Sequence, residues 1–344
     1  MKLQQLKTEE AVGHLLSHDI TKIEKGNFKG ALFKKGHRIT GADVNSLLDL
    51  GKNHIYVIEL EQGDLHEDEA GERIARALTG SGLQLSGPSE GRMDLIADQA
   101  GLLRIDASRL HRINRVTDVV VATLHNNSPV EKGEKVVGAK VVPLVVNEKT
   151  IKEIEDICRE DGPLATVLPY QRCRIGGLIT GREVFEGRIK DGFAPVLAEK
   201  TARYNLEKPL VRYCTDDAEL IRIGIEQLQA EGCDLIIVTG GMSVDPDDVT
   251  PTGIKLTGAE IVKYGAPALP GAMFLLAYNN SIPVIGLPAC AMYYQNTVLD
   301  IILPRLLAGQ RVSADDIAAL GHGGLCRRCA ECVFPNCSFG KGGC

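Results

Sequence analysis

The sequence lacks the features that would tie it to a membrane or to nucleic acid. No apolar run approaches the ~20 residues that a membrane-spanning helix needs. Residues 1–16 lack the basic-then-apolar order of a secretory signal peptide. A basic excess is also absent, because the 344 residues carry a formal net charge of -6, so the chain has no overall attraction to nucleic acid or to anionic membranes. We therefore expect a cytoplasmic protein that binds neither.

The composition is that of an ordinary globular protein, with 44% hydrophobic and 24% charged residues. A chain of this length is too long for one small core, and two or three domains are expected. The ten cysteines are distributed unevenly. Half of them are scattered singly, mostly within apolar runs, where a free cysteine behaves as a small buried hydrophobe. The other half lie together at residues 326–344.

The first half of the chain predicts mixed α and β structure. A short helix bounded by glycine precedes a strand over residues 54–60, and residues 67–78 have the pattern of an amphipathic helix. Three β-type runs follow, over residues 94–105, 116–124 and 135–146. We expect an α+β region at residues 1–79 and a β-rich region at 80–165, which ends with a linker helix over 148–159.

The second half has a different pattern, in which short apolar runs alternate with helical stretches of a dozen or more residues. The apolar runs span residues 174–180, 210–215, 234–239 and 283–288. The clearest helix follows Asp216 and Asp217 and ends before Gly232, and the last helix is expected over residues 291–307. The alternation predicts a three-layer α/β domain at residues 166–312, with a mostly parallel sheet between helices on both faces.

Ligands bind beyond the carboxyl ends of the strands in such sheets, so the loops after the strands should carry the chemistry. The loop after the third run is the most informative. Its paired Gly240 and Gly241 let backbone N–H groups approach an anion, and Ser243 adds a hydroxyl donor. Three carboxylates follow, at Asp245, Asp247 and Asp248, and Mg²⁺ prefers carboxylate and phosphate oxygens. The alternative is a polar turn whose aspartates bond to nearby backbone, but the preceding buried strand favours a ligand site.

Carboxylates in the loops after the first two runs have simpler explanations. Asp216 and Asp217 follow the second run, and either of them can cap the next helix. Glu183 follows the first run and is explained equally well as a solvated loop carboxylate. By themselves these residues do not identify a site.

Taken together, five motifs occur in a characteristic order. They are Thr-Gly-x-Glu at 180–183, Asp-Asp at 216–217, Thr-Gly-Gly-Met-Ser-Val at 239–244, Leu-Pro-Gly at 269–271 and Gly-Leu-Pro at 286–288. In these motifs the sequence resembles the molybdopterin-binding domain family, which includes enzymes that adenylate molybdopterin and enzymes that insert molybdate into it. The resemblance covers residues 174–310. Weaker similarity over residues 36–60 points to the molybdate-inserting branch.

This resemblance implies a ligand, a metal and a set of site residues. The ligand would be molybdopterin or its adenylylated form, with molybdate or tungstate as a second substrate and Mg²⁺ as the metal. The protein would be a homodimer that works with a molybdoenzyme or another cofactor-assembly protein. The pterin would be bound by Thr180, Gly181, Thr239, Gly240, Gly241, Ser243, Pro270, Gly271 and Pro288. Catalysis would rest on Glu183, Asp217, Asp247 and Asp248, and Asp245 and Asp248 would bind Mg²⁺.

The sequence departs from the molybdate-inserting enzymes at three places. Their Asp-Gly-Tyr-Ala stretch near the N-terminus is absent, Arg182 replaces an Asp, and residues 289–291 replace Gly-Asn-Pro with Ala-Cys-Ala. These departures favour binding over catalysis and leave three hypotheses open. The first is a molybdopterin-binding protein of cofactor biosynthesis that inserts molybdate with release of AMP, and the second is a carrier or sensor without turnover. The third is a nucleotide pyrophosphatase of the competence-damage type, where a Thr-Gly-Gly loop followed by Asp-Asp also occurs.

The chain ends in a cysteine-rich tail at residues 313–344. The spacing C-x2-C-x2-C-x4-C has the density of an iron–sulfur or zinc ligand set and resembles a bacterial ferredoxin run whose last spacing is one residue shorter. Its cysteines are Cys326, Cys329, Cys332 and Cys337. Without an export signal, such a cluster indicates a metal before disulfides. A tail without fixed structure, or disulfides after oxidation, are the alternatives.

Overall fold

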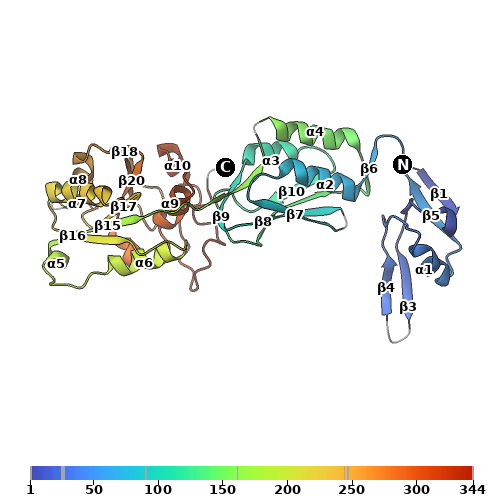
Figure 1. The fold of residues 1–344 in the computed structure, drawn as a ribbon, viewed down its shortest axis with the longest axis horizontal. Coiled ribbons are helices and arrows are strands. Elements are labelled where there is room, and N and C mark those ends of the chain that lie inside the picture. Colours follow the sequence, from blue (N-terminus) through green and yellow to red (C-terminus); the bar gives the residue numbers. More distant parts are fainter. Residues whose placement is uncertain are drawn as a thin grey trace. The chain divides into compact units, whose positions relative to one another are not determined.

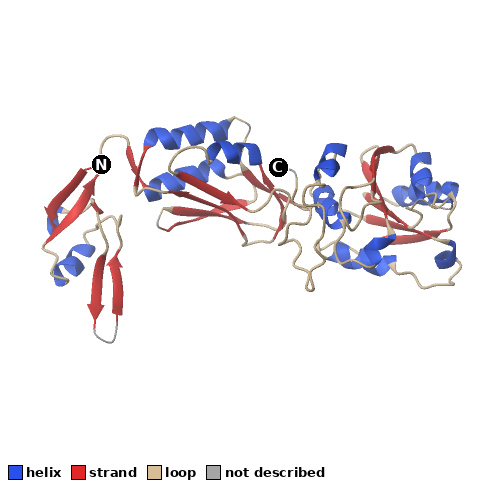
Figure 2. Cartoon of the chain, turned by 180° about the vertical axis from the view of Figure 1, so that it is seen from behind, coloured by secondary structure: helices blue, strands red, loops and turns tan. Residues whose placement is uncertain are grey.

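The computed structural model describes residues 2–24, 28–89, 91–160, 162–243, 245 and 248–342, and the chain divides into two compact units (Figures 1 and 2). The first unit comprises Met1–Asp98, Ile105–Leu124 and Lys132–Thr166, and the second comprises Gln99–Arg104, His125–Glu131 and Val167–Cys344. The predicted regions 1–79 and 80–165 thus fall largely in the first unit. The predicted α/β domain and the tail fall in the second. The exact domain boundaries stay predictions.

The N-terminal part of the first unit is a small sheet with one helix and a hairpin. Its elements are β1 Lys2–Lys7, η1 Thr8–Glu10, β2 Leu15–Leu16, β3 Ile20–Glu24, β4 Phe28–Phe33, α1 Asp43–Asp49 and β5 His54–Glu59. Strand β5 lies between β1 and β2, and β3 pairs with β4. Leu16, Ile39 and Val57 are buried in its core. The helix and strand expected before residue 60 are α1 and β5.

The rest of the first unit is a four-stranded antiparallel sheet covered by two amphipathic helices. Its elements are β6 Asp64–His66, α2 Glu67–Leu78, β7 Leu83–Ser89, β8 Arg92–Ala97, α3 Ala107–Ile113, β10 Val119–Thr123, β12 Lys135–Val141, β13 Val145–Asn147 and α4 Glu148–Arg159. The order of the sheet is β10-β12-β8-β7. Ala70, Ile74 and Leu78 of α2 are fully buried because apolar residues recur every three or four positions. Both helices, α2 and α4, have the bounds that the sequence predicted.

The second unit is an α/β sheet of six strands. Its elements are β15 Ile175–Thr180, α5 Arg182–Phe185, α6 Phe193–Ala202, β16 Leu210–Cys214, α7 Ala218–Ala230, β17 Leu235–Thr239, α8 Thr250–Leu256, β18 Glu260–Tyr264, β19 Leu275–Asn279, β20 Ile282–Leu287, η2 Ala289–Met292, α9 Val298–Leu307 and α10 Ala314–Ala319. The order is β16-β15-β17-β20-β19-β18. The first four strands in this order are parallel. Strand β19 pairs antiparallel with β20 on one side and with β18 on the other. The predicted fold class, mostly parallel α/β, is confirmed.

Helices cover both faces of this sheet, as Figure 1 shows for α6 and α7. Successive residues of a strand point to opposite faces. In β17, Leu235 and Ile237 therefore join the core beneath α6 and α9, while Ile236 and Val238 join the core beneath α7 and α8. All four residues are buried. This burial on both faces explains why the strand reads as a continuous apolar run.

One predicted helix is wrong in its bounds. The sequence predicted a final helix over residues 291–307, but α9 begins at Val298. Thr297 caps the helix, since its hydroxyl accepts from the backbone of Leu299, while the carboxylate of Asp300 accepts from the backbone N–H of Thr297. The residues before it form η2 and a loop at 293–296.

The tail packs onto the second unit. Phe339 is buried in the core that contains α9, and Cys326, Phe334 and Cys337 pack against that core. A short sheet in the order β11-β9-β14, with β9 at Gly101–Ile105, β11 at Pro129–Val130 and β14 at Ala165–Pro169, brings earlier residues to this unit. Within the described ranges, no helix has both the length and the apolar character needed to cross a bilayer.

Candidate functional site

Four parallel strands end at one edge of the sheet, which we call the carboxyl edge. In the strand register, Thr180 lies beside Cys214, and Thr239 lies beside Leu287. Because parallel strands share one direction, the loops that follow them all leave from this edge. The sheet therefore brings together the three loops that the sequence singled out and the loop after β20.

The glycine pair after β17 is held close to the neighbouring strand. Gly240 and Gly241 have φ angles of +87° and +54°, which favour glycine. A Cβ atom on Gly240 would lie 2.6 Å from Oγ1 of Thr180. That hydroxyl donates to the carbonyl of Thr239 at 3.0 Å, and the Thr250 hydroxyl donates to the carbonyl of Gly240 at 2.9 Å. The two threonine hydroxyls thus fix the position of the glycine backbone.

The N–H groups of this glycine pair have no acceptor in the described part of the chain. Among the residues that the structure describes, neither Gly240 nor Gly241 donates its N–H to a backbone or side-chain oxygen. Both residues are only partly exposed. Successive N–H groups in turn conformations form concavities that bind anions. The geometry therefore provides two donors for a phosphate at the carboxyl edge.

The aspartates after the glycine pair take part in closing the loop. The carboxylate of Asp248 accepts from the backbone N–H of Ser243 at 2.8 Å, and the N–H of Asp248 donates to the carbonyl of Asp245 at 2.9 Å. Asp248 thus bonds to nearby backbone, as expected if this loop is a polar turn. Asp245 is exposed, and the predicted catalytic Asp247 lies outside the described residues.

The other two loops are joined by one side chain. The carboxylate of Asp216 accepts from the backbone N–H of Arg182 at 3.0 Å, so it links the loop after β16 to the loop after β15. Asp217 is the N-cap of α7 and accepts from the N–H groups of Glu219 and Leu220 at 2.9 and 3.0 Å. Glu183 is exposed in the first turn of α5, whose N-cap is Gly181.

The predicted magnesium ligands have the right chemistry, because carboxylate oxygens are the donors that Mg²⁺ prefers. Asp245 and Asp248 lie in the loop after β17. Asp217 lies at the N-cap of α7 and Glu183 in the first turn of α5, also beyond the carboxyl edge. In the described ranges, however, no three His, Cys, Asp or Glu side chains are grouped so that they could hold one ion. The magnesium site therefore stays a prediction.

The loop at 269–271 also lies at this edge. It precedes β19, whose Leu275 pairs with Gly286 near the end of β20. A Cβ on Gly271, where φ is +121°, would lie 2.7 Å from Cγ2 of Val298 at the start of α9. Pro288 is buried after β20. The structure thus brings the predicted pterin-binding residues Pro270, Gly271 and Pro288 to the same side of the sheet as the glycine pair.

Burial, more than the neighbouring carboxylates, determines the charge of the Cys214 thiol at this edge. Burial, with smaller contributions from the charges of Asp216 and Asp217, raises the pKa of Cys214 to about 12. The thiol is therefore protonated at neutral pH. Burial and the nearby Asp248 also raise the pKa of Tyr264, whose hydroxyl donates to the carbonyl of Met242 at 3.0 Å. Tyr264 could not be identified from the sequence, because its strand β18 was not predicted.

A buried ion pair fixes the loop after β20. Nζ of Lys200 in α6 lies 2.7 and 2.8 Å from the carboxylate oxygens of Asp300 in α9, and it donates to the carbonyl of Gln295 at 2.9 Å. The two side chains are 4% and 6% exposed. The pattern Thr297-x-x-Asp300 could have revealed the helix cap, but no pattern in the sequence marks Lys200.

The tail cysteines surround one cavity. Cys326, Cys329, Cys332 and Cys337 line a cavity of about 230 Å³ together with residues of the loop at 293–296. Asn296 donates to Sγ of Cys332 at 3.0 Å. The tail also bonds to the predicted pterin loop, since the N–H of Leu269 donates to the carbonyl of Gly324 at 2.7 Å. The tail's iron–sulfur or zinc site stays a prediction, because the described thiols form no group that could hold an ion.

Comparison with known proteins identifies the α/β part. Residues 176–308 match the family model described as "Probable molybdopterin binding domain". Residues 5–59 match a model described only as a domain of unknown function. The resemblance read from the loop motifs is thus confirmed, since this part of the chain is similar to the molybdopterin-binding domain family.

Curated relatives and solved structures are similar over parts of the chain. A CinA-like protein of Mycobacterium sp. (strain JLS) is 33% identical over 90 residues, which are 26% of this chain and 21% of the relative. The chain thus matches about a fifth of the length of that relative. The molybdopterin biosynthesis enzyme MoaB of Thermus thermophilus is 21% identical over 40% of this chain and 98% of its own, with a TM-score of 0.34. The molybdopterin biosynthesis protein MoeA of Pyrococcus horikosii is 12% identical over 90% of this chain and 75% of its own, with a TM-score of 0.33.

Proposed function

We propose that the α/β domain binds molybdopterin, or its adenylylated form, at the carboxyl edge and that the chain acts in molybdenum cofactor biosynthesis. The glycine pair after β17 carries this proposal, because its two N–H groups have no acceptor in the described part of the chain. Backbone donors of this kind bind phosphate. The match of residues 176–308 to the molybdopterin-binding family supports a pterin phosphate as the anion.

The residues at this edge would have different roles toward the phosphate. Gly240 and Gly241 would donate their N–H groups. Ser243 would donate its hydroxyl, because its own N–H already bonds to Asp248. Thr180 lies behind the glycines and would position them without contacting the ligand. Pro270, Gly271 and Pro288 would form the neighbouring wall.

We further propose that molybdate displaces the group that protects the dithiolene sulfurs of the bound adenylylated pterin. Water then cleaves the phosphoanhydride bond, which releases AMP and leaves the phosphate on the pterin. Mg²⁺, when bound, would neutralise phosphate charge during this cleavage. Oxygen ligands to it would come from Asp245 and Asp248 in the loop after β17, joined by Glu183 and Asp217. A pterin carrier or sensor without turnover has the same binding site, so only turnover separates the two hypotheses. The homodimer and the cytoplasmic location stay predictions.

The test is AMP release from adenylylated molybdopterin by the anaerobically purified full chain with Mg²⁺ and molybdate. We expect AMP only when molybdate is present, and loss of release in Asp248→Asn. The matched control is Asp315→Asn, which removes an exposed carboxylate of α10 in the same unit. Tight pterin binding without AMP would leave the carrier or sensor. Equal release by Asp248→Asn would contradict the assigned role of that carboxylate.

A nucleotide pyrophosphatase is the second candidate, and the similarity to CinA-like proteins is the reason to keep it. The phosphate donors at the carboxyl edge would serve a nucleotide diphosphate as well as a pterin phosphate. Hydrolysis of ADP-ribose in the absence of any pterin would support this candidate. No hydrolysis, together with pterin binding, would exclude it.

We also propose that the tail cysteines bind a thiophilic metal, as an iron–sulfur cluster or Zn²⁺. Four cysteines that line one cavity support this proposal, since both metals take thiolate ligands. Metal analysis and visible absorbance of the anaerobically purified chain would identify the metal. Cys329→Ser should lower the metal content, whereas Cys233→Ser, at a buried cysteine beside the sheet, should not.

A further inference from the structure

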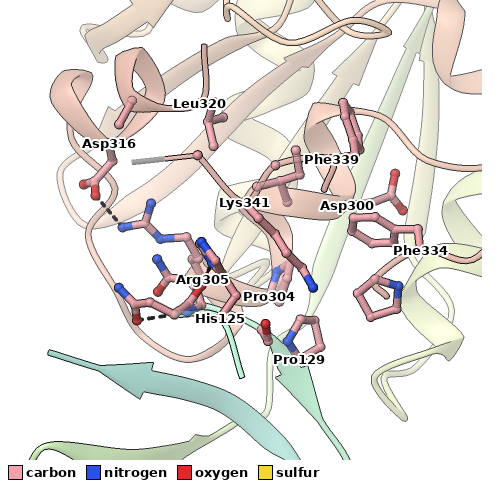
Figure 3. A pocket seen from close by; sticks show the side chains of 18 of the residues that line it. His125, Pro129, Asp300, Pro304, Arg305, Asp316, Leu320, Phe334, Phe339 and Lys341 are labelled. Carbon is pink, nitrogen blue, oxygen red and sulfur yellow. Dashed lines mark hydrogen bonds and ion pairs between the residues drawn. The ribbon is translucent and has the colours of Figure 1, made fainter. Parts of the chain in front are cut away.

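A second cavity lies in the same unit, lined along α9 as far as Pro304 and Arg305 near the end of that helix. It measures about 150 Å³, and we call it the Arg104 pocket. Its walls come from the end of β9, the loop at 125–129, α9 and the tail at 334–342 (Figure 3). None of the predicted pterin-binding residues lines it.

Two guanidinium groups stand side by side in this pocket. Arg305 is buried, and its Nη2 lies 2.6 Å from a carboxylate oxygen of Asp316, which neutralises it. Arg104 donates only to neutral acceptors, Oδ1 of Asn127 at 2.7 Å and Oε1 of Gln310 at 3.4 Å. Within the described ranges, Arg104 has no carboxylate partner. Its guanidinium therefore has no directly bonded counterion in the described part of the chain.

The electrostatic setting of Arg104 is unfavourable without a ligand. Burial, followed by the charge of Arg305, lowers the pKa of Arg104, and the charge of Asp316 offsets this only in part. A guanidinium that is half removed from water and lies beside another cation gains strongly from an anion. Gln310, which both arginines share as an acceptor, supplies no charge.

The tail adds a third cation, Lys341, to the lining of the pocket. Lys341 points into the pocket in Figure 3 and forms no ion pair in the part of the chain that the structure describes. Asp300 also lines the pocket, but its carboxylate is bound by Lys200 at 2.7 Å. With Asp316 neutralising Arg305, the charges of Arg104 and Lys341 remain in excess. Phe334 and Pro129 complete the pocket with apolar surface.

We propose that the Arg104 pocket binds a small tetrahedral oxyanion between Arg104 and Lys341. Phosphate, sulfate, molybdate and tungstate share this shape and negative charge. The planar fork of a guanidinium matches two oxygens of such an anion, and an ammonium adds a point charge from the other side. This site is separate from the pterin site, and it requires the tail to be folded onto the unit.

Isothermal titration calorimetry of the full chain tests the proposal, in a chloride buffer at constant ionic strength, with sodium phosphate, sulfate, molybdate and tungstate as separate titrants. We expect at least one of them to bind saturably. Arg104→Gln should weaken that binding by about tenfold or more, the usual size of one charge-assisted bond. Lys341→Gln should weaken it as well. Arg222→Gln, which removes an equal charge on α7 outside the pocket, should leave it unchanged.

The outcomes separate the sources of the anion. A preference for molybdate and tungstate identifies a store of the metal oxyanion, and a preference for phosphate identifies a phosphorylated ligand; both support the site. Absence of saturable binding by all four anions overturns the proposal, as does unchanged affinity in both Arg104→Gln and Lys341→Gln. If Arg104→Gln fails to fold, by circular dichroism, Lys341→Gln alone decides. Asp248→Asn, which affects the pterin site, should keep full oxyanion binding.

Discussion

The buried pair of Lys200 and Asp300 gives the sharpest stability prediction. In Lys200→Met, the carboxylate loses bonds of 2.7 and 2.8 Å and stays buried with an uncompensated charge. Breaking such a pair costs about 3–5 kcal/mol, and Arg203, 3.5 Å from the carboxylate, compensates only in part. The carbonyl of Gln295 also loses its donor, which contributes about 1–3 kcal/mol to that loss. We expect a total loss of about 4 kcal/mol.

The double variant Lys200→Met with Asp300→Asn separates charge from packing. An asparagine at position 300 keeps an oxygen for the cap of α9 but carries no charge, so about 2 kcal/mol should return. Urea unfolding followed by circular dichroism measures both variants against the wild type. A loss below about 1 kcal/mol in the single variant, or an equal loss in the double variant, would refute the reasoning.

Three further predictions concern other parts of the molecule. Gly240→Ala should destabilise the second unit by about 2 kcal/mol, because φ is +87° there and the new Cβ meets a hydroxyl at 2.6 Å, and urea unfolding measures this loss. Iodoacetamide at pH 8 should label the exposed Cys332 before Cys214, whose pKa burial raises to about 12, and peptide mass spectrometry reports the order. The backbone N–H and then the side chain of Arg109 lower the pKa of Asp106 to about 2, so its stabilisation is present above pH ~4 and lost as the pH falls toward 2. Asp106→Asn should therefore cost about 1 kcal/mol at pH 7, discounted for partial exposure, and almost nothing at pH 2, as unfolding at the two pH values would show.

Much of the fold could be predicted because its signals are local. Helices α2 and α4 carry apolar residues at helical spacing between clear caps, and both ends of each were predicted. Strands β15, β17 and β20 are largely buried and stand out as apolar runs, whereas β16 at the edge of the sheet is only partly buried. The antiparallel strand β18 was missed, because its residues are mostly exposed and show no alternation. The loop at 293–296 was taken for helix, since its cap at Thr297 lies inside a helical-looking stretch.

Only part of the candidate site could be predicted from the sequence. The glycine pair could be found, because closely spaced glycines at a strand end have few structural uses. The fixed position of the glycine pair could not be predicted, since it depends on how the fold places the hydroxyls of Thr180 and Thr250 against the glycine backbone. The pairing of Arg104 with Arg305 could not be predicted, because 200 residues of chain separate them and only the tertiary fold brings them to one pocket.

The most direct test of the central claim is equilibrium binding of molybdopterin to the anaerobically purified chain. We predict saturable binding at one site that Ser243→Ala weakens by about tenfold, because one hydroxyl donor to the phosphate is lost. Arg104→Gln should bind the pterin as the wild type does. Absence of saturable binding would contradict the assignment of the pterin phosphate to the loop after β17. Wild-type affinity in both Ser243→Ala and Gly240→Ala would contradict it as well.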